Sequence, residues 1–355
     1  MSGPLSGLRV VEMAGIGPAP LAATLLTDLG AEVLRICRPD EMADGLDGFG
    51  RGRPHLRLNL KDPADQGRLH TILAACDVLL EGFRPGVAER LGFGPDVALE
   101  RNPRLIYARM TGWGQQGPRA LQAGHDINYI SVTGGLHAIG EAGRKPVPPL
   151  NLVGDFGGGT AFVVIGILAA LHERGSSGKG QVIDAAMIDG ATYLMSMLFR
   201  DFNKGIWRDE RGVNSLDGGA PHYSTYETSD GEWMAVGSIE PPFYAELLDK
   251  LGLTDAPERT RENWPKLSAL FASRFLTKTR EQWTEIFATS DACVSPVLSL
   301  TEAPHEAHLA ARGTFIAAPD GSGVEPAPAP RFSRTPAVRS SSEDTAGLLA
   351  AWGVD

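Results

Sequence analysis

The stretch LRVVEMAGIGPAPLAATLLTDLGAEVLRI, residues 8–36, decides the fold. Residues 8–15 have the pattern of a buried strand. Residues 18–31 have helical spacing with proline in the first turn, and residues 32–36 are strand-like again. A strand, a helix and a strand of these lengths form a β–α–β unit, whose two strands run parallel. The stretch therefore predicts an α/β fold with a Rossmann-like parallel sheet.

The same alternation of strands and helices continues for about two hundred residues. The pattern predicts helices at 62–76 and 155–175, strands at 77–82 and 104–110, a turn at 174–180, and a strand that leads into a helix at 181–190. The first of these helices has an aspartate at its start, Asp62, followed by Pro63, which is typical of a capped helix. The alternation therefore extends the parallel sheet beyond the first unit.

The alternation of strand and helix patterns stops after about residue 205. The different pattern that follows predicts a second, smaller α+β domain. Residues 224–238 have the pattern of a β-hairpin around Asp230-Gly231, and helices are expected at 241–252 and 280–289. Residues 318–342 are rich in Pro, Ser and Gly and suggest an extended return path that ends in a short helix. The expected division is a large domain at 1–205 and 318–355, a small domain at 222–310, and linkers at 206–221 and 311–317.

Composition and charge exclude several classes of protein. The chain has 355 residues, a net charge of -10 and three widely spaced cysteines. An acidic chain is a poor general nucleic-acid binder, and three cysteines fit a reducing cytoplasm better than a disulfide framework. The longest apolar run, residues 161–171, is shorter than the roughly 20 residues of a membrane span. His305 and His308 lack the spacing and the third ligand of a zinc site, so no metal is expected.

Basic residues gather in the first third of this acidic chain. GIGPAP (15–20) is a weak dinucleotide-binding pattern because its third glycine is missing, and the strand at 32–36 leads to Arg38 instead of an acidic residue. Each basic side chain alone is explained as solvated surface charge. Together they could surround a polyphosphate ligand at the carboxyl edge of the sheet. The set is Arg38, Arg51, Arg53, Arg57, Lys61, Arg84 and Arg90.

Three titratable residues are candidates for catalysis, and each has an ordinary structural alternative. His125 follows Gly124 at the start of an expected helix and is either a base or a structural histidine. Asp155, in LVGDFGGG, is either a helix N-cap or a catalytic group. Glu240 precedes a helix and is either a functional group or an ordinary charge at the surface or at the start of that helix. The residue types alone leave these alternatives open.

The sequence resembles the α-methylacyl-CoA racemases of the family III CoA-transferase superfamily over most of its length. The motifs that carry this resemblance include LRVVEMAGIGPAP, EGFRPGVAERLGFGP, NPRLIYARMTGWGQQGP, AGHDINYI, PPLNLVGDFGGG and SSGKGQVIDAAMIDG. The resemblance implies an interlocked homodimer of ring-shaped chains. It also implies an acyl-CoA thioester as the small-molecule substrate, with CoA as part of that substrate and no separate cofactor.

The resemblance also assigns roles to residues. His125 and Asp155 match the acid/base pair on opposite faces of the substrate α-carbon, Glu240 matches a glutamate that hydrogen-bonds near that pair, and the backbone of Asp126 matches the donor to the thioester oxygen. The implied CoA pocket comprises Arg38, Leu58, Asn59, Leu60, Lys61, Gly82, Phe83, Arg84, Arg90, Gly124, His125, Asp126, Ile127, Asn128 and Tyr129.

Two other functions remain alternatives. CoA transferases of the same superfamily use an aspartate at the position of Asp155 as a nucleophile that forms an acyl anhydride. They need no histidine at position 125 and usually carry a glycine-rich loop near position 240, where this chain has SIEPP. A catalytically silent acyl-CoA binding protein is the third possibility. Exchange of the α-proton in deuterated water distinguishes the racemase from both.

Overall fold

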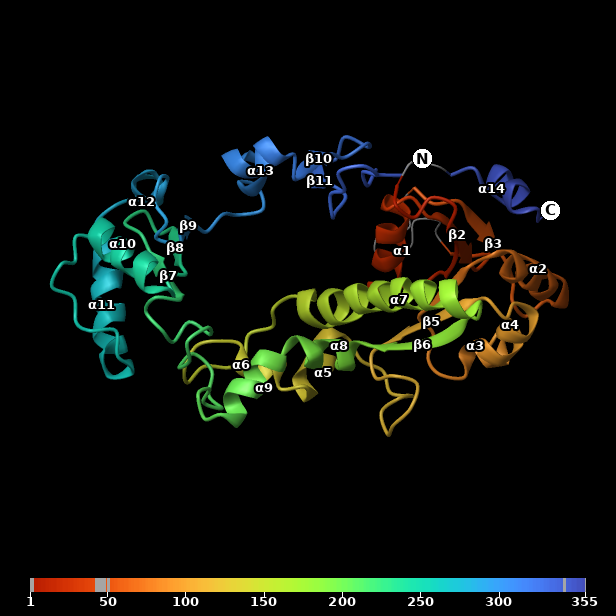
Figure 1. Cartoon of the computed structure of the whole chain (residues 1–355), viewed down its shortest axis with the longest axis horizontal. Coiled ribbons are helices and arrows are strands. Elements are labelled where there is room, and N and C mark those ends of the chain that lie inside the picture. The colour runs from red at the N-terminus through yellow and green to blue at the C-terminus, as the bar shows by residue number, and fades with distance from the viewer. Residues whose placement is uncertain (1–2, 42–48, 50–51, 341–342, 355) are drawn as a thin grey trace. The chain divides into compact units, whose positions relative to one another are not determined.

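A computed structural model describes residues 3–41, 49, 52–340 and 343–354, and it divides the chain into two compact units. The larger unit comprises Met1–Thr133, Pro149–Met195 and Ala327–Asp355, and the smaller one comprises Gly134–Pro148 and Ser196–Pro326. Figure 1 shows the elements of each unit. The domain limits expected from the sequence stay a prediction.

A six-stranded parallel sheet forms the centre of the larger unit, with the strand order β3-β2-β1-β4-β5-β6. The strands are β1 (Arg9–Met13), β2 (Glu32–Cys37), β3 (His55–Arg57), β4 (Val78–Glu81), β5 (Ile106–Thr111) and β6 (Gln181–Ala186). This order reverses between β1 and β4, and ligands of such sheets bind at the carboxyl ends of the strands beside the reversal. The α/β fold predicted from the sequence is confirmed.

Helices cover both faces of this sheet (Figure 1). Apolar side chains of α1 (Pro18–Asp28) and α7 (Phe162–Ser177) pack with Val10, Val33 and Ile106 on one face. The opposite face packs against α2 (Pro63–Ala75), α3 (Val87–Arg90), α4 (Pro95–Arg101) and α14 (Thr345–Trp352). Because side chains alternate between the two faces of a strand, a strand covered on both faces carries apolar side chains toward both, as Val10 and Val11 do in β1.

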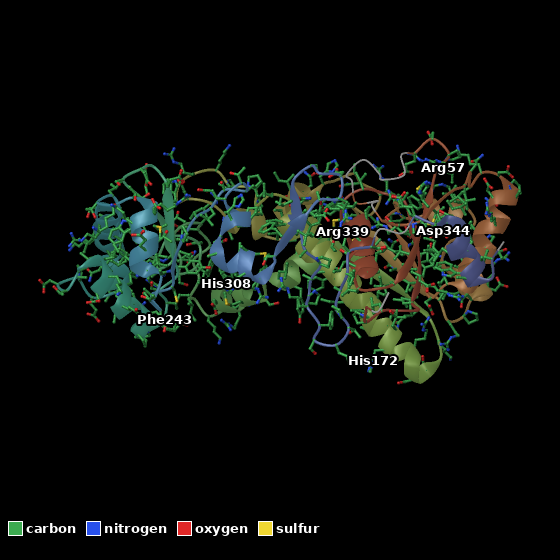
Figure 2. The ribbon with its side chains drawn as sticks, turned by 90° about the horizontal axis from the view of Figure 1, so that it is seen from above. Arg57, His172, Phe243, His308, Arg339 and Asp344 are labelled. Carbon is green, nitrogen blue, oxygen red and sulfur yellow. The ribbon has the colours of Figure 1, made fainter. Side chains whose placement is uncertain are left out.

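The carboxyl-terminal helix α14 lies beside β3, at the edge of the sheet. The hydroxyl of Thr345 donates to the carbonyl of His55 at 2.9 Å and accepts from its N–H at 3.1 Å. Figure 2 labels Arg57 on β3 and Asp344 at the start of this helix. The indole N–H of Trp352 donates to the carboxylate of Glu32 at 2.7 Å. These contacts explain how the chain end predicted as a short helix is held against the large unit.

Further helices in the larger unit carry residues of the candidate active site described below. They are α5 (Asp126–Val132), the π-helix η1 (Leu152–Ala161) and α8 (Met187–Leu194). Together η1 and α7 form a 26-residue apolar helical stretch, Leu152–Ser177, which among the described residues is the one long and apolar enough to cross a membrane. A core helix of a soluble protein passes the same test, and the inner face of α7 packs against the sheet. This stretch is therefore weak evidence of a membrane span.

The smaller unit has its own core around an antiparallel sheet. The strands β7 (Ser224–Glu227), β8 (Trp233–Val236) and β9 (Val294–Pro296) pair in that order, and the hairpin predicted around Asp230-Gly231 is confirmed. Aromatic side chains of Phe271, Phe275 and Trp283 fill the core. The remaining elements are α6 (Gly135–Ala138), α9 (Ser196–Asn203), α10 (Pro241–Leu251), η2 (Arg261–Asn263), α11 (Trp264–Phe275), α12 (Arg280–Phe287), η3 (Ala303–His305), α13 (Ala307–Arg312), β10 (Phe315–Ala317) and β11 (Val324–Pro326).

Three local expectations were wrong. The turn expected at 174–180 begins only at Gly178, because α7 continues to Ser177 and ends on that glycine in the left-handed conformation. Part of the extended path at 318–342 is instead a hairpin, since Val324 in β11 pairs with Ala317 in β10. The helix expected from Asp155 begins earlier, at Leu152, and its first part is a π-helix.

Candidate active site

Two neighbouring cavities open at the carboxyl edge of the parallel sheet, and all of their lining residues belong to the larger unit. Their volumes are about 880 and 350 Å³. Ile16, Ala19, Gly82 and Phe83 line both cavities, so the loops after β1 and β4 separate them. These are the two strands between which the strand order reverses.

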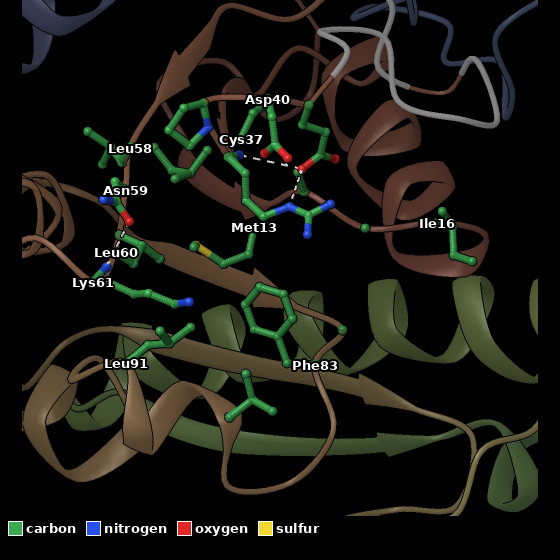
Figure 3. Close-up of a pocket in the computed structure, with 18 of the residues that line it drawn as sticks. Met13, Ile16, Cys37, Asp40, Leu58, Asn59, Leu60, Lys61, Phe83 and Leu91 are labelled. Carbon is green, nitrogen blue, oxygen red and sulfur yellow. Dashed lines mark hydrogen bonds and ion pairs between the residues drawn. The ribbon is translucent and has the colours of Figure 1, made fainter.

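The larger cavity collects seven of the fifteen expected CoA-binding residues (Figure 3). They are Arg38, Leu58, Asn59, Leu60, Lys61, Gly82 and Phe83. Figure 3 shows the side chain of Lys61 directed toward the ring of Phe83. The side chain of Arg38 is 76% exposed, and its ion pair with Glu41 is long, at 3.6 Å. Arg38 and Lys61 thus contribute two cations to the lining of this cavity, beside apolar side chains such as those of Leu58 and Phe83.

Buried ion pairs hold the strand ends beneath the cavities. The Glu12 carboxylate on β1 lies 2.5 Å from the guanidinium of its cross-strand neighbour Arg35, and Arg53 reaches the same carboxylate at 2.9 Å. Glu81, the last residue of β4, pairs at 2.9 Å with Arg109, its neighbour on β5, and accepts a hydrogen bond from the N–H of Phe83 at 2.6 Å. Glu81 therefore fixes the loop that separates the two cavities.

The smaller cavity brings together the two principal candidates, His125 and Asp155. His125 is the residue before α5, and the carboxamide oxygen of Asn128 accepts a hydrogen bond from its N–H at 3.1 Å. Asp155 lies in the first turn of the π-helix, so the interpretation of Asp155 as a helix N-cap is wrong. His125 and Asp155, which are thirty positions apart in the sequence, thus line the same cavity.

The side chain of Asp126 links the segments that carry these two residues. Its buried Oδ2 accepts hydrogen bonds from the N–H groups of Gly154 at 2.7 Å and Asp155 at 2.8 Å. A Cβ atom at Gly154 would lie 2.6 Å from this oxygen, closer than real Cβ contacts allow. The glycine is therefore required for the π-helix to approach α5.

The environment of Asp155 favours its protonated form. Burial raises the pKa of this carboxyl group above its usual value, and the neighbouring charge of Asp126 acts in the same direction. A hydrogen bond from Asn151 and the proximity of His125 lower the pKa by less, so the net shift is upward. Gly17, in a left-handed conformation with φ of 72°, faces Asp155, since a Cβ there would be 3.8 Å from the carboxylate.

Aromatic side chains form one wall of the smaller cavity. The ring of Tyr129 packs edge-on against Trp113 at 5.0 Å, and its hydroxyl donates to the carbonyl of Gly124. A Cβ at Gly112 or Gly124 would collide with the Tyr129 ring, at 2.1 and 2.7 Å. Gly124 thus makes room for Tyr129. The sequence explains this glycine by the close approach of a ligand, and the structure adds packing against Tyr129 as a second reason.

The structure does not bring every predicted residue to these cavities. Arg90 lies in α3 with its guanidinium near Gly86 and is outside both linings in the described part of the chain, and so are the side chains of Asp126, Ile127 and Asn128. Arg53 is buried and paired with Glu12, so its assignment to an open basic cluster was wrong. Arg51 lies outside the described residues. Glu240 belongs to the smaller unit, where it precedes α10.

Several lining residues were not identified from the sequence. They include Trp113 and Gln122. Trp113 and Gln122 lie on the connection between β5 and α5, and long loops after the strands of such a sheet are a general signal for ligand contact. The sequence suggests a methionine-containing wall that includes Met187 as a possible acyl contact, with ordinary helix core as the alternative. Met187 is buried at 7% exposure and also lines the smaller cavity.

The chain matches the model of CoA-transferase family III over residues 5–346. It belongs to this family. It is 48% identical to the α-methylacyl-CoA racemase of Mus musculus over 344 residues, which cover 96% of this chain and 89% of that one, and 46% identical to the racemase of Homo sapiens over 343 residues, with the same coverage. The resemblance to the racemases, and with it the expectation of an enzyme, is confirmed.

More distant relatives include transferases and proteins of the same fold. The acetyl-CoA:oxalate CoA-transferase of Acetobacter aceti is 29% identical over 340 residues, covering 88% of this chain and 86% of that one. The structure of a CaiB/BaiF family protein from Brucella suis superposes with a TM-score of 0.82 at 25% identity, with 100% of both chains covered. Family membership alone is therefore compatible with racemisation or CoA transfer.

Proposed function

We propose that this enzyme epimerises the α-carbon of 2-methylacyl-CoA thioesters by moving a proton between the two faces of that carbon. The observation that carries the proposal is that His125 and Asp155 line one cavity, adjacent to a larger cavity lined by Arg38 and Lys61. Identities of 48% and 46% to two α-methylacyl-CoA racemases support the same reaction.

In one direction neutral His125 removes the α-proton from the S epimer, and an enolate forms. The backbone N–H of Asp126 donates to the thioester oxygen as negative charge develops there. Protonated Asp155 then gives its proton to the opposite face, which leaves an imidazolium and a carboxylate. The reverse direction begins from that pair, with Asp155 as base toward the R epimer. The raised pKa of Asp155 supports its role as an acid in the forward direction.

Phosphate groups and the adenine of CoA would bind at the larger cavity. Arg38 and Lys61 would neutralise phosphate charge, and Leu58, Leu60 and Phe83 offer apolar contacts. The reactive thioester would then lie past the loop at Gly82 and Phe83, which line both cavities. Proton transfer between two side chains and one carbon needs no further cofactor, and among the described residues no cluster suited to a metal ion is found.

The test is proton NMR of each pure epimer of a 2-methylacyl-CoA in deuterated buffer. Wild-type protein should exchange the α-proton of both epimers. His125→Ala should lose exchange mainly from the S epimer and Asp155→Ala mainly from the R epimer, each by about 10²–10⁴-fold, the contribution of a positioned base. Circular dichroism checks that both variants fold. Equal losses from both epimers would contradict the two-face assignment.

The same experiment separates the racemase from a CoA transferase. In a transferase, Asp155 would attack the thioester as a nucleophile and form an acyl anhydride, and the α-proton would stay in place. That alternative predicts transfer of CoA to a carboxylate acceptor and no deuterium uptake. A silent binding protein would show neither reaction.

A homodimer is a further part of this proposal, and it rests on the resemblance to the racemases. The chain mass is 37.8 kDa, so mass measurement in solution at micromolar concentration should give about twice that value. A fully active monomer would contradict this part and leave the proposed chemistry intact. A cytoplasmic location likewise stays a prediction from cysteine usage.

A further inference from the structure

Arg259 holds the two peptide units that immediately precede Glu240. Its Nη1 donates to the carbonyl of Ser238 at 3.0 Å and to the carbonyl of Ile239 at 2.8 Å. Hydrogen bonds from a guanidinium are charge-assisted and stronger than those between neutral groups. The backbone that leads into Glu240 is therefore fixed by a side chain twenty positions further along the chain.

The same guanidinium also contacts the chain just after Glu240. It lies 4.5 Å from the centre of the Tyr244 ring, and the N–H of Tyr244 donates to the carbonyl of Glu240 at 3.0 Å. His222 packs edge-on against that ring at 6.2 Å. Burial, followed by the charge of Arg259, lowers the pKa of His222 to about 4, so this imidazole is neutral at pH 7 and adds no second positive charge. Arg259 thus contacts the chain on both sides of Glu240.

A second set of contacts braces the same segment from the two residues that directly precede β9. The N–H of Gly237 donates to the carbonyl of Cys293 at 2.9 Å, and the hydroxyl of Ser238 donates to the carbonyl of Ala292. Cys293 has a φ of 55°, a left-handed conformation that is strained for a residue with a side chain. Such a conformation persists where the surrounding structure imposes it, and it is common beside functional sites.

We propose that Arg259 is a positioning residue for Glu240, which holds the backbone of the Gly237–Glu240 segment and so fixes the place from which the exposed Glu240 side chain projects at the start of α10. This inference rests on the proposed function, because the resemblance to the racemases gives Glu240 its role near the acid/base pair. Arg259 itself acts through the backbone and has no assigned contact with substrate. A purely structural arginine would stabilise the unit without affecting the rate.

Arg274 provides a matched control at the other end of the same helix. Its Nε donates to the carbonyl of Leu251 at 2.7 Å and its Nη2 to the carbonyl of Gly252 at 3.0 Å, so it also binds two successive carbonyls of the backbone at one end of α10. Arg259→Met and Arg274→Met remove similar contacts at opposite ends of α10. The two variants are compared in the full-length chain by deuterium exchange, kcat, KM and urea unfolding.

The expected result is a lower kcat in Arg259→Met, by about 10- to 100-fold, with KM changed by less than about twofold, because a small misplacement of a functional group has an effect of this size. Arg274→Met should keep the wild-type kcat. In the double variant with Glu240→Ala, Arg259→Met should add little to the loss caused by Glu240→Ala alone, since both act on the same group. Arg259→Lys, which keeps a charged donor, should recover part of kcat.

Three outcomes would overturn the proposal. Equal kcat in Arg259→Met and Arg274→Met would make Arg259 structural, and so would a fully additive loss in the double variant. Full activity of Glu240→Ala would remove the group that Arg259 is proposed to position. Absence of exchange in the wild-type chain would instead contradict the proposed function. If Arg259→Met does not fold, Arg259→Gln and Arg274→Gln, which each keep a neutral donor, replace the methionine pair, and equal kcat in those two variants would likewise make Arg259 structural.

Discussion

The carboxylate of Asp126 accepts a hydrogen bond from the backbone N–H of Asp155 at 2.8 Å. Asp126 directly follows His125, so one side chain ties the start of α5 to the first turn of the π-helix. The N–H of Gly154 donates to the same oxygen, Oδ2. The relative placement of the two proposed acid/base groups therefore depends on a buried residue between two backbone segments.

Substitutions at Asp126 should separate hydrogen bonding from charge. Asp126→Ala leaves the N–H groups of Gly154 and Asp155 without their acceptor, and a buried unsatisfied donor costs about 1–3 kcal/mol. Asp126→Asn keeps an oxygen that can accept both bonds and removes the charge. We expect a clear loss of the free energy of unfolding and of exchange in the alanine variant and a smaller loss in the asparagine variant, measured by urea unfolding and NMR. Equal losses would show that the two hydrogen bonds are not what matters.

The raised pKa of Asp155 predicts a pH-dependent stability difference. Burial, followed by the charge of Asp126, raises this pKa above the ordinary value of 3.8, while Asn151 and His125 lower it by less. The folded chain therefore holds this proton more tightly than the unfolded chain. The contribution of Asp155 to the free energy of unfolding must fall as the pH rises from 3.8 through the raised pKa, and the penalty is complete above it.

Asp155→Asn cannot ionise and should escape this penalty. We expect it to be more stable than the wild type at pH 7, with a difference that shrinks as the pH approaches the ordinary value of 3.8. Urea unfolding of both proteins at several pH values measures the difference. A difference that stays constant with pH would mean that the substitution acts through packing or hydrogen bonding instead of ionisation.

Much of the sheet was predictable because its signals are local. Apolar strands followed by helices with proline or aspartate at their starts gave β1, α1, β2 and α2 within a few residues of their observed limits. The π-helix was not predictable, because such helices are rare and short and LVGDFGGG only suggested a weak helix start. Because the π-helix was missed, Asp155 was expected at the start of a helix, whereas it lies within the first turn.

Contacts between distant segments were also beyond the sequence. An arginine such as Arg53 is usually exposed, and its burial becomes understandable only when Glu12 on β1 is seen 2.9 Å away. The link between Asp126 and Gly154 joins residues 28 positions apart, and that between Arg259 and Ser238 joins residues 21 positions apart. Pairing over such separations is set by the packing of whole elements, so single residues carry little signal for it.

Affinity for the substrate should depend on Arg38. Its guanidinium is highly exposed, and exposed ion pairs such as that with Glu41 at 3.6 Å are worth about 0–1 kcal/mol, so it is available to bind phosphate. Arg38→Ala should raise KM several-fold with little change in kcat, and added salt should raise the wild-type KM because salt screens the attraction. Arg68, on the exposed side of α2 and outside both cavity linings, is the control. An unchanged KM in Arg38→Ala would remove Arg38 from the site.

Two glycine-to-alanine substitutions should have opposite effects on stability. A Cβ at Gly154 would lie 2.6 Å from Oδ2 and 2.9 Å from Cγ of Asp126, so the added methyl group must push the Asp126 carboxylate away from the N–H of Asp155. Overpacking of this kind costs about 1–3 kcal/mol. A Cβ at Gly67, inside α2, would meet nothing within 4 Å, and alanine favours a helix by about 0.5–1 kcal/mol over glycine.

We therefore expect Gly154→Ala to lower both the free energy of unfolding and the rate of α-proton exchange, whereas Gly67→Ala raises the former and leaves the rate unchanged. Urea unfolding and NMR exchange measured on both variants provide the comparison. The loss of exchange in Gly154→Ala should affect both epimers, because the shift of the π-helix disturbs Asp155 whether it acts as acid or as base. A variant that is destabilised but exchanges at the wild-type rate would show that Asp155 keeps its position without the Asp126 contact.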